Sequence, residues 1–516
     1  MTLIDPRTPV IVGVAQYGDR VSEPDAALTP LAMLEKVARD ALADSGADSG
    51  AAAGALAGLD WLTVIRTFPD SAPVFKPPFW GYTNLPRSLA NRLGASPARL
   101  TYPHAGGNTP QWFINMYCEA IARGEAEICL LAGVEALRTA ARVQKTGIVP
   151  DWSEDPGGPA PEVIGDDRPG VSRAEMAHQM IMPTSVYPLF ENALGHHYGR
   201  DPVRHRQALG ALMQPFTEVA AGNPWSALAS PRTAAELCEP SDDNRYIAYP
   251  YTKYFNANMF VDQAAAVWVM STAAADRLGV PRDRRCYLHG AADTTEKWYV
   301  SERVNYYSSP AIAIGAAEAL GQAGRGIADM ALVDIYSCFP VAVEVAADAI
   351  GLAHADPRGL TVTGGLPYFG GPGNNYVTHS IAEMVARLRR QAGAFGLVTA
   401  NGMYLTKHSF GVYSTTPTPA PFARVDPKSY QTRIDAMESP PLNAAPTGVG
   451  TIETFTVVYN RGAPASAPVI GRLPTGERFL GLVSDPAQAA AMVDRPVIGR
   501  PVQVATGETF NSVTLV

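Results

Sequence analysis

The chain has 516 residues, 47% of them hydrophobic and 17% charged, and its formal net charge is −8. This length predicts two to four domains, and the acidic balance argues against a protein that binds nucleic acid through a broad basic face. The five cysteines are mostly far apart and form no C-x-x-C pair, so we expect reduced thiols in the cytoplasm and no zinc ribbon. The N-terminus lacks the pattern of a signal peptide, and no stretch of ~18 apolar residues predicts a membrane span.

Strand-like and helix-like segments alternate in the first part of the chain. Residues 10–14 form a short run rich in valine and isoleucine, residues 31–43 have helical periodicity, and residues 59–65 again favour a strand. This alternation predicts a largely parallel sheet covered by helices. Residues 138–245 are rich in Pro, Gly and Asp, break the alternation, and predict an insertion that covers a site.

Two strand patterns occur twice along the chain. The pattern of residues 59–64 returns at 333–339, and the pattern of residues 127–133 returns at 396–402, with a similar offset. Coincidence is the alternative, but a duplication explains both pairs and predicts two α/β halves.

The sequence changes character near residue 415, where the first of two proline-rich stretches begins. Short strand patterns follow at residues 450–459, 469–473, 478–483 and 501–504. Several short strands separated by turns are typical of a small β-barrel. The predicted domains are therefore a first half at 1–280 with its insertion at about 138–245, a second half at 281–418, and a barrel at 420–516.

A glycine pair precedes a strongly predicted helix start. Gly106 and Gly107 are followed by Asn108, Thr109 and a proline, and the next helix, residues 111–122, is apolar nearly all round and predicted to be buried. The glycines let backbone N–H groups approach a ligand at the positive end of this helix, with His104 and Asn108 beside it. A tight loop before a core helix is the alternative.

A second glycine-rich loop, residues 364–375, precedes a predicted helix at 376–390. The G-x-G-x-x-G pattern of dinucleotide-binding proteins is missing. A loop that presents its backbone, including Gly371, to the carbonyl of an acyl thioester fits the pattern better.

Polar side chains follow the predicted strands of the second half. Residues 333–340 read as a strand ending in Tyr336, Ser337 and Cys338, where sites of α/β proteins lie, although a buried core cysteine is the alternative. Asn401, Lys407 and His408 follow the last strand of this half. His408 is a candidate general acid or base, or an ordinary hydrogen-bonded histidine. The pair at 196–197 has no partner at metal-ligand spacing, so no metal is predicted.

At these loops the sequence resembles the thiolase superfamily, most closely its sterol-carrier-type branch, over about residues 8–415. The family's nucleophilic cysteine corresponds to Gly107, within a residue. Three further motifs correspond in order: His-Asp-Cys-Phe to residues 336–339, Gly-His-Pro to residues 370–372, and Cys-x-Gly to residues 400–402. Only Cys338 of the usual catalytic set remains. Residues 450–504 resemble the OB-fold domain that accompanies related acyl-CoA proteins, without its zinc ribbon.

This resemblance implies an α/β protein with a duplicated thiolase fold, in which the two halves form a five-layered sandwich, and an OB-like barrel. It implies an acyl-CoA thioester as substrate or ligand in lipid metabolism, no cofactor besides coenzyme A as part of the substrate, and a monomer or homodimer. Steroid side-chain-cleaving aldolases of this superfamily also lack the nucleophile and carry a tyrosine at the position of Tyr336.

The resemblance leaves three functions open, and whether the protein is an enzyme at all. The first is retro-aldol cleavage of a β-hydroxyacyl-CoA, with Tyr336 aided by Cys338 or His408 and backbone N–H groups near Gly107 or Gly371 on the thioester oxygen. Substrate contacts are expected from His104, Gly107, Asn108, Gly371 and Asn401. The second is acyl-CoA binding without catalysis, and the third is an acetyl-CoA acetyltransferase-like reaction through unfamiliar residues.

Overall fold

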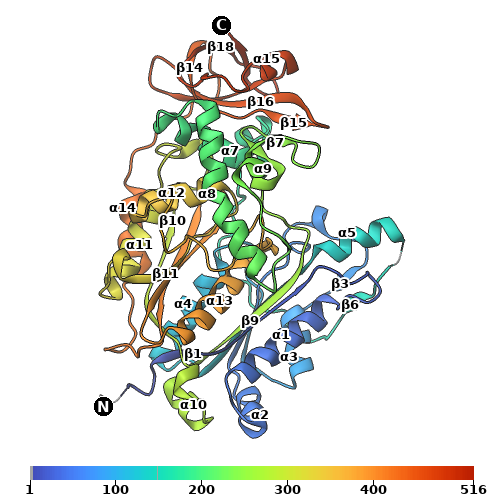
Figure 1. Ribbon diagram of the computed structural model, residues 1–516, viewed down its shortest axis with the longest axis vertical. Coiled ribbons are helices and arrows are strands. Elements are labelled where there is room, and N and C mark those ends of the chain that lie inside the picture. The colour runs from blue at the N-terminus through green and yellow to red at the C-terminus, as the bar shows by residue number, and fades with distance from the viewer. Residues whose placement is uncertain (1–3, 148) are drawn as a thin grey trace.

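The computed structural model describes residues 4–147 and 149–516 and contains two mixed β-sheets, helices between and around them, and a β-barrel at one end (Figure 1). The first sheet has the strand order β1 (Pro9–Asp19), β9 (Asp262–Ser271), β5 (Ile128–Ala136), β2 (Trp61–Val64) and β4 (Arg99–Thr101). The second has the order β10 (Tyr287–Thr295), β13 (Lys407–Ser414), β12 (Phe395–Gly402) and β11 (Met330–Asp334).

The two sheets repeat one topology, which confirms the predicted duplication. In each, the first two pairings are antiparallel and the next is parallel, so the sheets are mixed and not largely parallel as predicted. The first strand of each half carries a bulge that includes a glycine, Gly13 or Gly290. A Cβ atom at either glycine would lie 1.9 Å from the carbonyl oxygen of Ala41 or Ala319 in the covering helix. Both helices therefore need glycine to reach the sheet.

Two buried helices lie between the sheets: α4 (Thr109–Arg123) and α13 (Tyr376–Arg390), which both contact strands of each half. Outside the first sheet lie α1 (Pro30–Asp44) and α3 (Leu85–Leu93), and outside the second lie α11 (Pro310–Gln322) and α12 (Pro340–Ile350) (Figure 1). The result is five layers, as the resemblance implies. The N-terminal end of α4 faces residues of the second half, so a site there combines both halves. Smaller peripheral elements are α2 (Ser49–Ala57), α10 (Thr272–Arg277), β3 (Trp80–Tyr82) and β6 (Trp152–Glu154).

The free edge of the first sheet is covered by the chain itself. Next to β4, the Tyr102 N–H donates to the Glu162 carbonyl, the Glu162 N–H donates to Leu100, and the His104 N–H donates to Ile164. These bonds add residues 162–164 to the sheet as an irregular extra strand. The edge is therefore not available for pairing with a second copy in this conformation.

The segment predicted as an insertion contains the helices α5 (Leu137–Thr146), α6 (Arg173–Ala177), α7 (Pro183–His197), α8 (Pro202–Gly222) and α9 (Ala234–Cys238). The strands β7 (Tyr246–Ala248) and β8 (Tyr251–Thr252) follow it. Figure 1 shows α7 and α8, in green, between the barrel and the two sheets. Among the described residues, no helix is both long enough and apolar enough to span a membrane.

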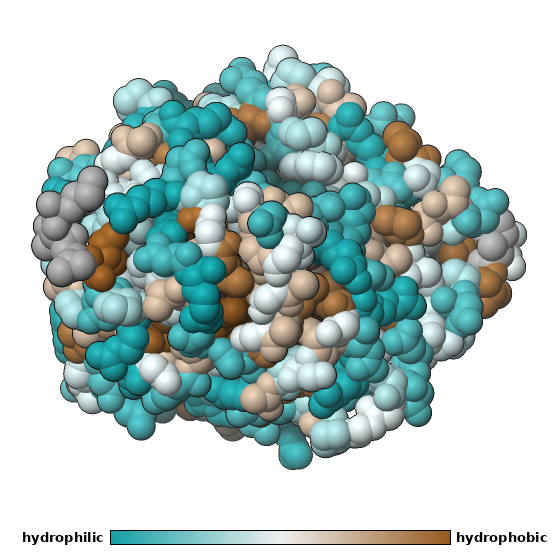
Figure 2. All heavy atoms as spheres, turned by 90° about the horizontal axis from the view of Figure 1, so that it is seen from below, coloured by the Kyte–Doolittle hydropathy of each residue, from teal (hydrophilic) through white to brown (hydrophobic). Residues whose placement is uncertain are grey.

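The C-terminal strands close into the predicted small β-barrel in the order β14 (Gly448–Phe455), β18 (Pro501–Ala505), β19 (Ser512–Leu515), β17 (Arg478–Val483) and β16 (Ala463–Arg472), which pairs back with β14. The short β15 (Val458–Asn460) leaves the barrel and pairs with β7 of the main body. The helix α14 (Pro427–Asp435) precedes the barrel and α15 (Pro486–Ala490) lies beside it. On the face opposite the barrel, Figure 2 shows small hydrophobic patches separated by hydrophilic side chains.

One fully buried arginine fastens the barrel to the second half. The Arg478 side chain has 0% exposure and donates to Glu453 within the barrel through Nε and Nη2. Its Nη1 donates to the carbonyl oxygens of Ser301 and Arg303 in the main body. Four of the five guanidinium protons thus have a defined acceptor, and the contact crosses from one domain to the other.

Replacing Arg478 by methionine should strongly destabilise the protein, because it leaves the Glu453 carboxylate and two carbonyl groups with fewer partners. We expect a loss of about 3–5 kcal/mol in the free energy of unfolding, measured by urea denaturation. The matched control is Arg472→Met, since Arg472 also pairs with Glu453 but is 33% exposed and makes no contact with the main body among its hydrogen bonds. Its loss should be about 1 kcal/mol or less. Equal losses in the two variants would contradict the anchoring role.

Candidate functional site

Gly107 lies at the N-terminal end of α4 in close contact with the second half. A Cβ atom at this position would lie 2.5 Å from the Tyr336 hydroxyl oxygen and 2.5 Å from the carbonyl oxygen of Asn401. Non-bonded atoms do not approach so closely in a packed interior. The tyrosine hydroxyl therefore occupies the space into which a cysteine side chain at 107 would project.

Tyr336, Cys338 and Asn401 lie together beside this helix end. Tyr336 follows β11, which ends at Asp334, so the strand predicted to run through Cys338 is shorter and these side chains sit in the loop before α12. The Asn401 side-chain amide donates to the Tyr187 hydroxyl at 3.0 Å and approaches the Cys338 sulfur at 3.9 Å. Tyr187, on α7, is a site residue that the sequence did not indicate.

Burial keeps three of the predicted catalytic groups uncharged at neutral pH. It raises the pKa of Tyr336 well above its usual range and that of the Cys338 thiol to about 12. It lowers the pKa of His408 to about 3, and the His408 Nε2 lies 3.2 Å from the Leu405 carbonyl oxygen. Since a thiolate is the reactive form of cysteine, Cys338 is poorly suited to nucleophilic attack.

Lys407 is a further residue at the same helix end. Its ammonium donates to the Ala105 carbonyl at 2.8 Å, and a Cβ atom at Gly106 would lie 2.8 Å from Nζ. Burial lowers the pKa of Lys407 to about 8. The position of Lys407 immediately before His408 was visible in the sequence, but nothing there indicates that the side chain folds back onto the glycine pair.

Asn108 and Asn401 each present an unused acceptor near this point. The side-chain oxygens of both are buried and have no hydrogen-bond partner within residues 4–147 and 149–516. Asn108 precedes α4 without capping it, because its side-chain amide donates to Ser409 across the site. Unpaired buried acceptors are costly, so this arrangement favours a ligand that donates hydrogen bonds.

Two predicted contact residues, Gly371 and His104, are not part of the cluster of Tyr336, Cys338 and Asn401, called the Tyr336 group below. The Gly371 N–H donates to the Asn258 carbonyl at 2.8 Å, so it is not free to bind a thioester oxygen. In contrast to Gly107, a Cβ atom at Gly371 would have ordinary contacts of 3.5 Å or more. His104 instead lines a cavity of about 580 Å³ together with Asn108, Lys407 and His408. Tyr336, Asn401 and His408 also line a small space of about 10 Å³, close to the volume needed by one water molecule.

A basic cavity of about 690 Å³ lies on the other side of the glycine-rich loop. Its lining includes four cationic side chains but a single acidic one, Asp19; the cationic residues are Arg20, Arg138, Arg232 and Lys253. Two elements connect it to the Tyr336 group. Helix α7 places Thr184 in the cavity and Tyr187, almost one turn on, against Asn401. The loop 364–375 places Tyr368 in the cavity, and its Asn374 accepts a hydrogen bond from the Gly106 N–H.

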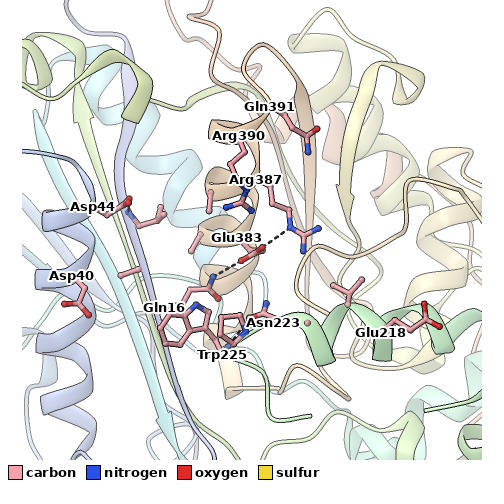
Figure 3. Close-up of a pocket in the computed structure, with 17 residues that line it drawn as sticks. Gln16, Asp40, Asp44, Glu218, Asn223, Trp225, Glu383, Arg387, Arg390 and Gln391 are labelled. Atoms are coloured by element: carbon pink, nitrogen blue, oxygen red, sulfur yellow. Dashed lines mark hydrogen bonds and ion pairs between the residues drawn. The ribbon is translucent and has the colours of Figure 1, made fainter. Parts of the chain in front are cut away.

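A further cavity, of about 900 Å³, adjoins the basic cavity at Trp225 (Figure 3). It lies between α1, the end of α8 and the C-terminal half of α13, where Glu383 bridges Gln16 and Arg387. Tyr376 begins α13 at the site, and Arg390 in the cavity is about 20 Å further along the helix at 1.5 Å per residue. Acidic and basic side chains line this cavity together, so it lacks the charge bias of the basic cavity.

The contact at Gly107 predicts that even one added carbon atom is costly. Gly107→Ala should lower the free energy of unfolding by about 2 kcal/mol, because Tyr336 or the Asn401 backbone must shift. Gly371→Ala is the matched control and should change it by about 0.5 kcal/mol or less. Adding Tyr336→Phe to Gly107→Ala should restore part of the loss, since it removes one of the two clashing oxygens. Equal tolerance of both alanines in urea denaturation would contradict this packing.

Comparisons with known proteins agree with the fold. Residues 429–509 match the family model described as the thiolase-like protein type 1 additional C-terminal domain. Over 266 residues the chain is 26% identical to a 3-ketoacyl-CoA thiolase of Escherichia coli O157:H7. The aligned region covers 47% of this chain and 58% of that protein, so the chain spans little more than half the length of this curated relative.

Solved structures extend the likeness to the whole chain. The Ltp2-ChsH2(DUF35) aldolase aligns with a TM-score of 0.57 and 17% identity over 79% of this chain and 98% of that chain, which shows a shared fold alone. A monomeric SCP2-thiolase-like protein type 1 from Mycobacterium smegmatis is 35% identical, with a TM-score of 0.85 and 100% of both chains covered. The chain therefore belongs to the type 1 SCP2-thiolase-like proteins of the thiolase superfamily.

Proposed function

We propose that the protein binds an acyl-CoA thioester and does not form an acyl-enzyme. The observation that carries this proposal is the Tyr336 hydroxyl in the space of the missing cysteine side chain. Covalent catalysis requires an activated nucleophile, and the nearby Cys338 thiol is held protonated by burial, with a pKa of about 12. All five cysteines are free and buried, in keeping with a reducing compartment such as the cytoplasm.

The basic cavity is the proposed site of the nucleotide part of coenzyme A. Its four cationic side chains suit phosphate groups, and its connections through α7 and the loop 364–375 lead towards the N-terminal end of α4. In this arrangement the thioester lies beside Gly107 and Tyr336, where the helix end and the neutral hydroxyl favour the carbonyl oxygen.

Isothermal titration calorimetry with acyl-CoA esters tests the binding. Lys253→Met should weaken binding about tenfold, because it removes one charge from the basic cavity. The matched control is Lys428→Met, which removes a lysine from the 580 Å³ cavity and should leave the affinity unchanged. Mass spectrometry after incubation should find no added acyl group. An acyl group on Cys338 would contradict the proposal and favour the acyltransferase alternative.

A second candidate, retro-aldol cleavage of a β-hydroxyacyl-CoA, is favoured by the presence of Tyr336 and Lys407 at the same end of α4. One is an acid held protonated by burial, and the other is an amine whose pKa is lowered to about 8. In this reaction the neutral amine takes the β-hydroxyl proton and the Cα–Cβ bond breaks to a ketone or aldehyde. The electron pair forms the thioester enolate, stabilised by the Tyr336 hydroxyl, and the proton returns to Cα.

The pH dependence of cleavage tests the role of Lys407. Because the base must be uncharged, kcat/KM should rise with pH and level off above about 8. Lys407→Met should lower kcat/KM by about 100-fold or more and remove this rise, whereas Tyr336→Phe should lower it without moving the inflection. A kcat/KM that falls as the pH rises through 8 would contradict this role of Lys407. If acyl-CoA esters bind but are not cleaved, acyl-CoA binding alone remains the proposed function.

A further inference from the structure

Three buried ionisable side chains meet where the insertion packs on the second half. Glu191 comes from α7, His205 from α8 and Glu344 from α12, and their exposures are 0%, 4% and 1%. One ligand atom of each lies within 4.8 Å of the other two, and the Glu191 Oε1 and His205 Nε2 atoms are 2.8 Å apart. None of these residues belongs to the Tyr336 group or to the basic cavity.

Each of the three side chains is held on its outer side, and their inner atoms face one another, with Glu191 Oε1 and His205 Nε2 in direct contact. The Tyr251 hydroxyl donates to Glu191 Oε2 at 2.6 Å, and Arg200 donates to Glu344 Oε1 at 3.1 Å. The three inward atoms, Glu191 Oε1, His205 Nε2 and Glu344 Oε2, are buried and have no hydrogen bond of acceptable geometry among the described residues. Outer groups that hold carboxylates in place around a cluster of inward-facing donor atoms are typical of metal centres.

The charges of the cluster also leave room for a cation. The carboxylates of Glu191 and Glu344 face one another, and the Arg200 guanidinium pairs with Glu344. The His354 Nδ1 atom lies 3.6 Å from Glu344 Oε1. The cluster thus combines two buried carboxylates with one permanent cation, and a bound cation would balance the second negative charge.

We propose that Glu191, His205 and Glu344 bind one divalent transition-metal ion of the Zn²⁺ or Mn²⁺ class. One imidazole and two carboxylates form a donor set that suits these ions. Bonds of about 2.1 Å in a tetrahedron place ligand atoms about 3.4 Å apart, so small side-chain movements bring the three atoms into range. Binding through Nε2 places the imidazole proton on Nδ1, so the Arg200 Nη1 that lies 3.4 Å from Nδ1 must turn away from it and donate to Glu344 alone.

The ion would have a structural role next to the candidate site. It would join α7 and α8 to α12, and one turn before Glu191 on α7 lies Tyr187, which contacts Asn401. The Tyr251 side chain that donates to Glu191 also stacks on Phe339. Phe339 directly follows Cys338 and directly precedes α12. A small groove beside the barrel, lined by Arg200 and His205, provides an approach from the surface.

Metal analysis of the full-length protein tests this proposal without any CoA ester. Elemental analysis after purification without chelators should find about one metal ion per chain. After chelation, adding Zn²⁺ or Mn²⁺ should raise the melting temperature by about 3 °C or more, whereas Mg²⁺ should not. Both effects should be lost in Glu344→Gln and in His205→Gln. The matched control is Asp348→Asn, one turn along α12, which should retain them.

Two results would overturn the proposal. One is a wild-type protein that holds no metal and shows no shift, with Glu344→Gln as stable or more stable, as expected if the carboxylates only share a proton. The other is an equal shift in wild type and in both ligand variants, which would place the ion elsewhere, for instance on cysteines. A visible spectrum of bound Co²⁺ without a thiolate charge-transfer band would exclude the cysteines. Because no assay uses a thioester, failure here is separate from failure of the proposed function.

Discussion

The contact between Gly107 of the first half and Tyr336 and Asn401 of the second fixes how the two halves meet at the site. The hydroxyl group and the carbonyl oxygen both come within 2.5 Å of the point where any side chain at 107 would begin. Gly402 packs on the same helix end, since a Cβ atom there would lie 3.2 Å from the Gly107 nitrogen. The packing therefore excludes any side chain at 107, and introducing a cysteine there would require changes in the second half as well.

The same burial has opposite chemical effects on the acids and the amine around this contact. It disfavours the charged form of every group, so Tyr336 and Cys338 keep their protons while Lys407 gives up its proton more readily. The candidate site thus combines a neutral donor with an amine that is partly uncharged near neutral pH. This combination suits binding and non-covalent proton transfer to a thioester, and it does not suit acyl transfer through a thiolate.

Local patterns predicted the elements well and the contacts poorly. The helix at 376–390 and the strand at 478–483 have the predicted bounds, because each is a periodic segment between clear breaks. The motif order singled out Gly107 and Tyr336 as candidates, but their contact joins positions in different halves that no local pattern relates. Lys407 was noted beside His408 but given no role, because the sequence does not show where its side chain ends. The cluster of Glu191, His205 and Glu344 was not indicated by the sequence, because these residues come from three helices with none of the short spacings that mark metal motifs.

Helix α7 explains why a thiolase-like body and a barrel occur in one rigid arrangement. Its Tyr187 donates to the Met403 carbonyl and accepts from Asn401, while its Asn192 donates to the carbonyl groups of Tyr249 and Phe455. Phe455 is in barrel strand β14, so one helix contacts the site and the barrel within two turns. Arg478 holds the same barrel to the second half from the other side. The barrel therefore supports the wall of the site from behind, through α7, at a distance from the reacting groups.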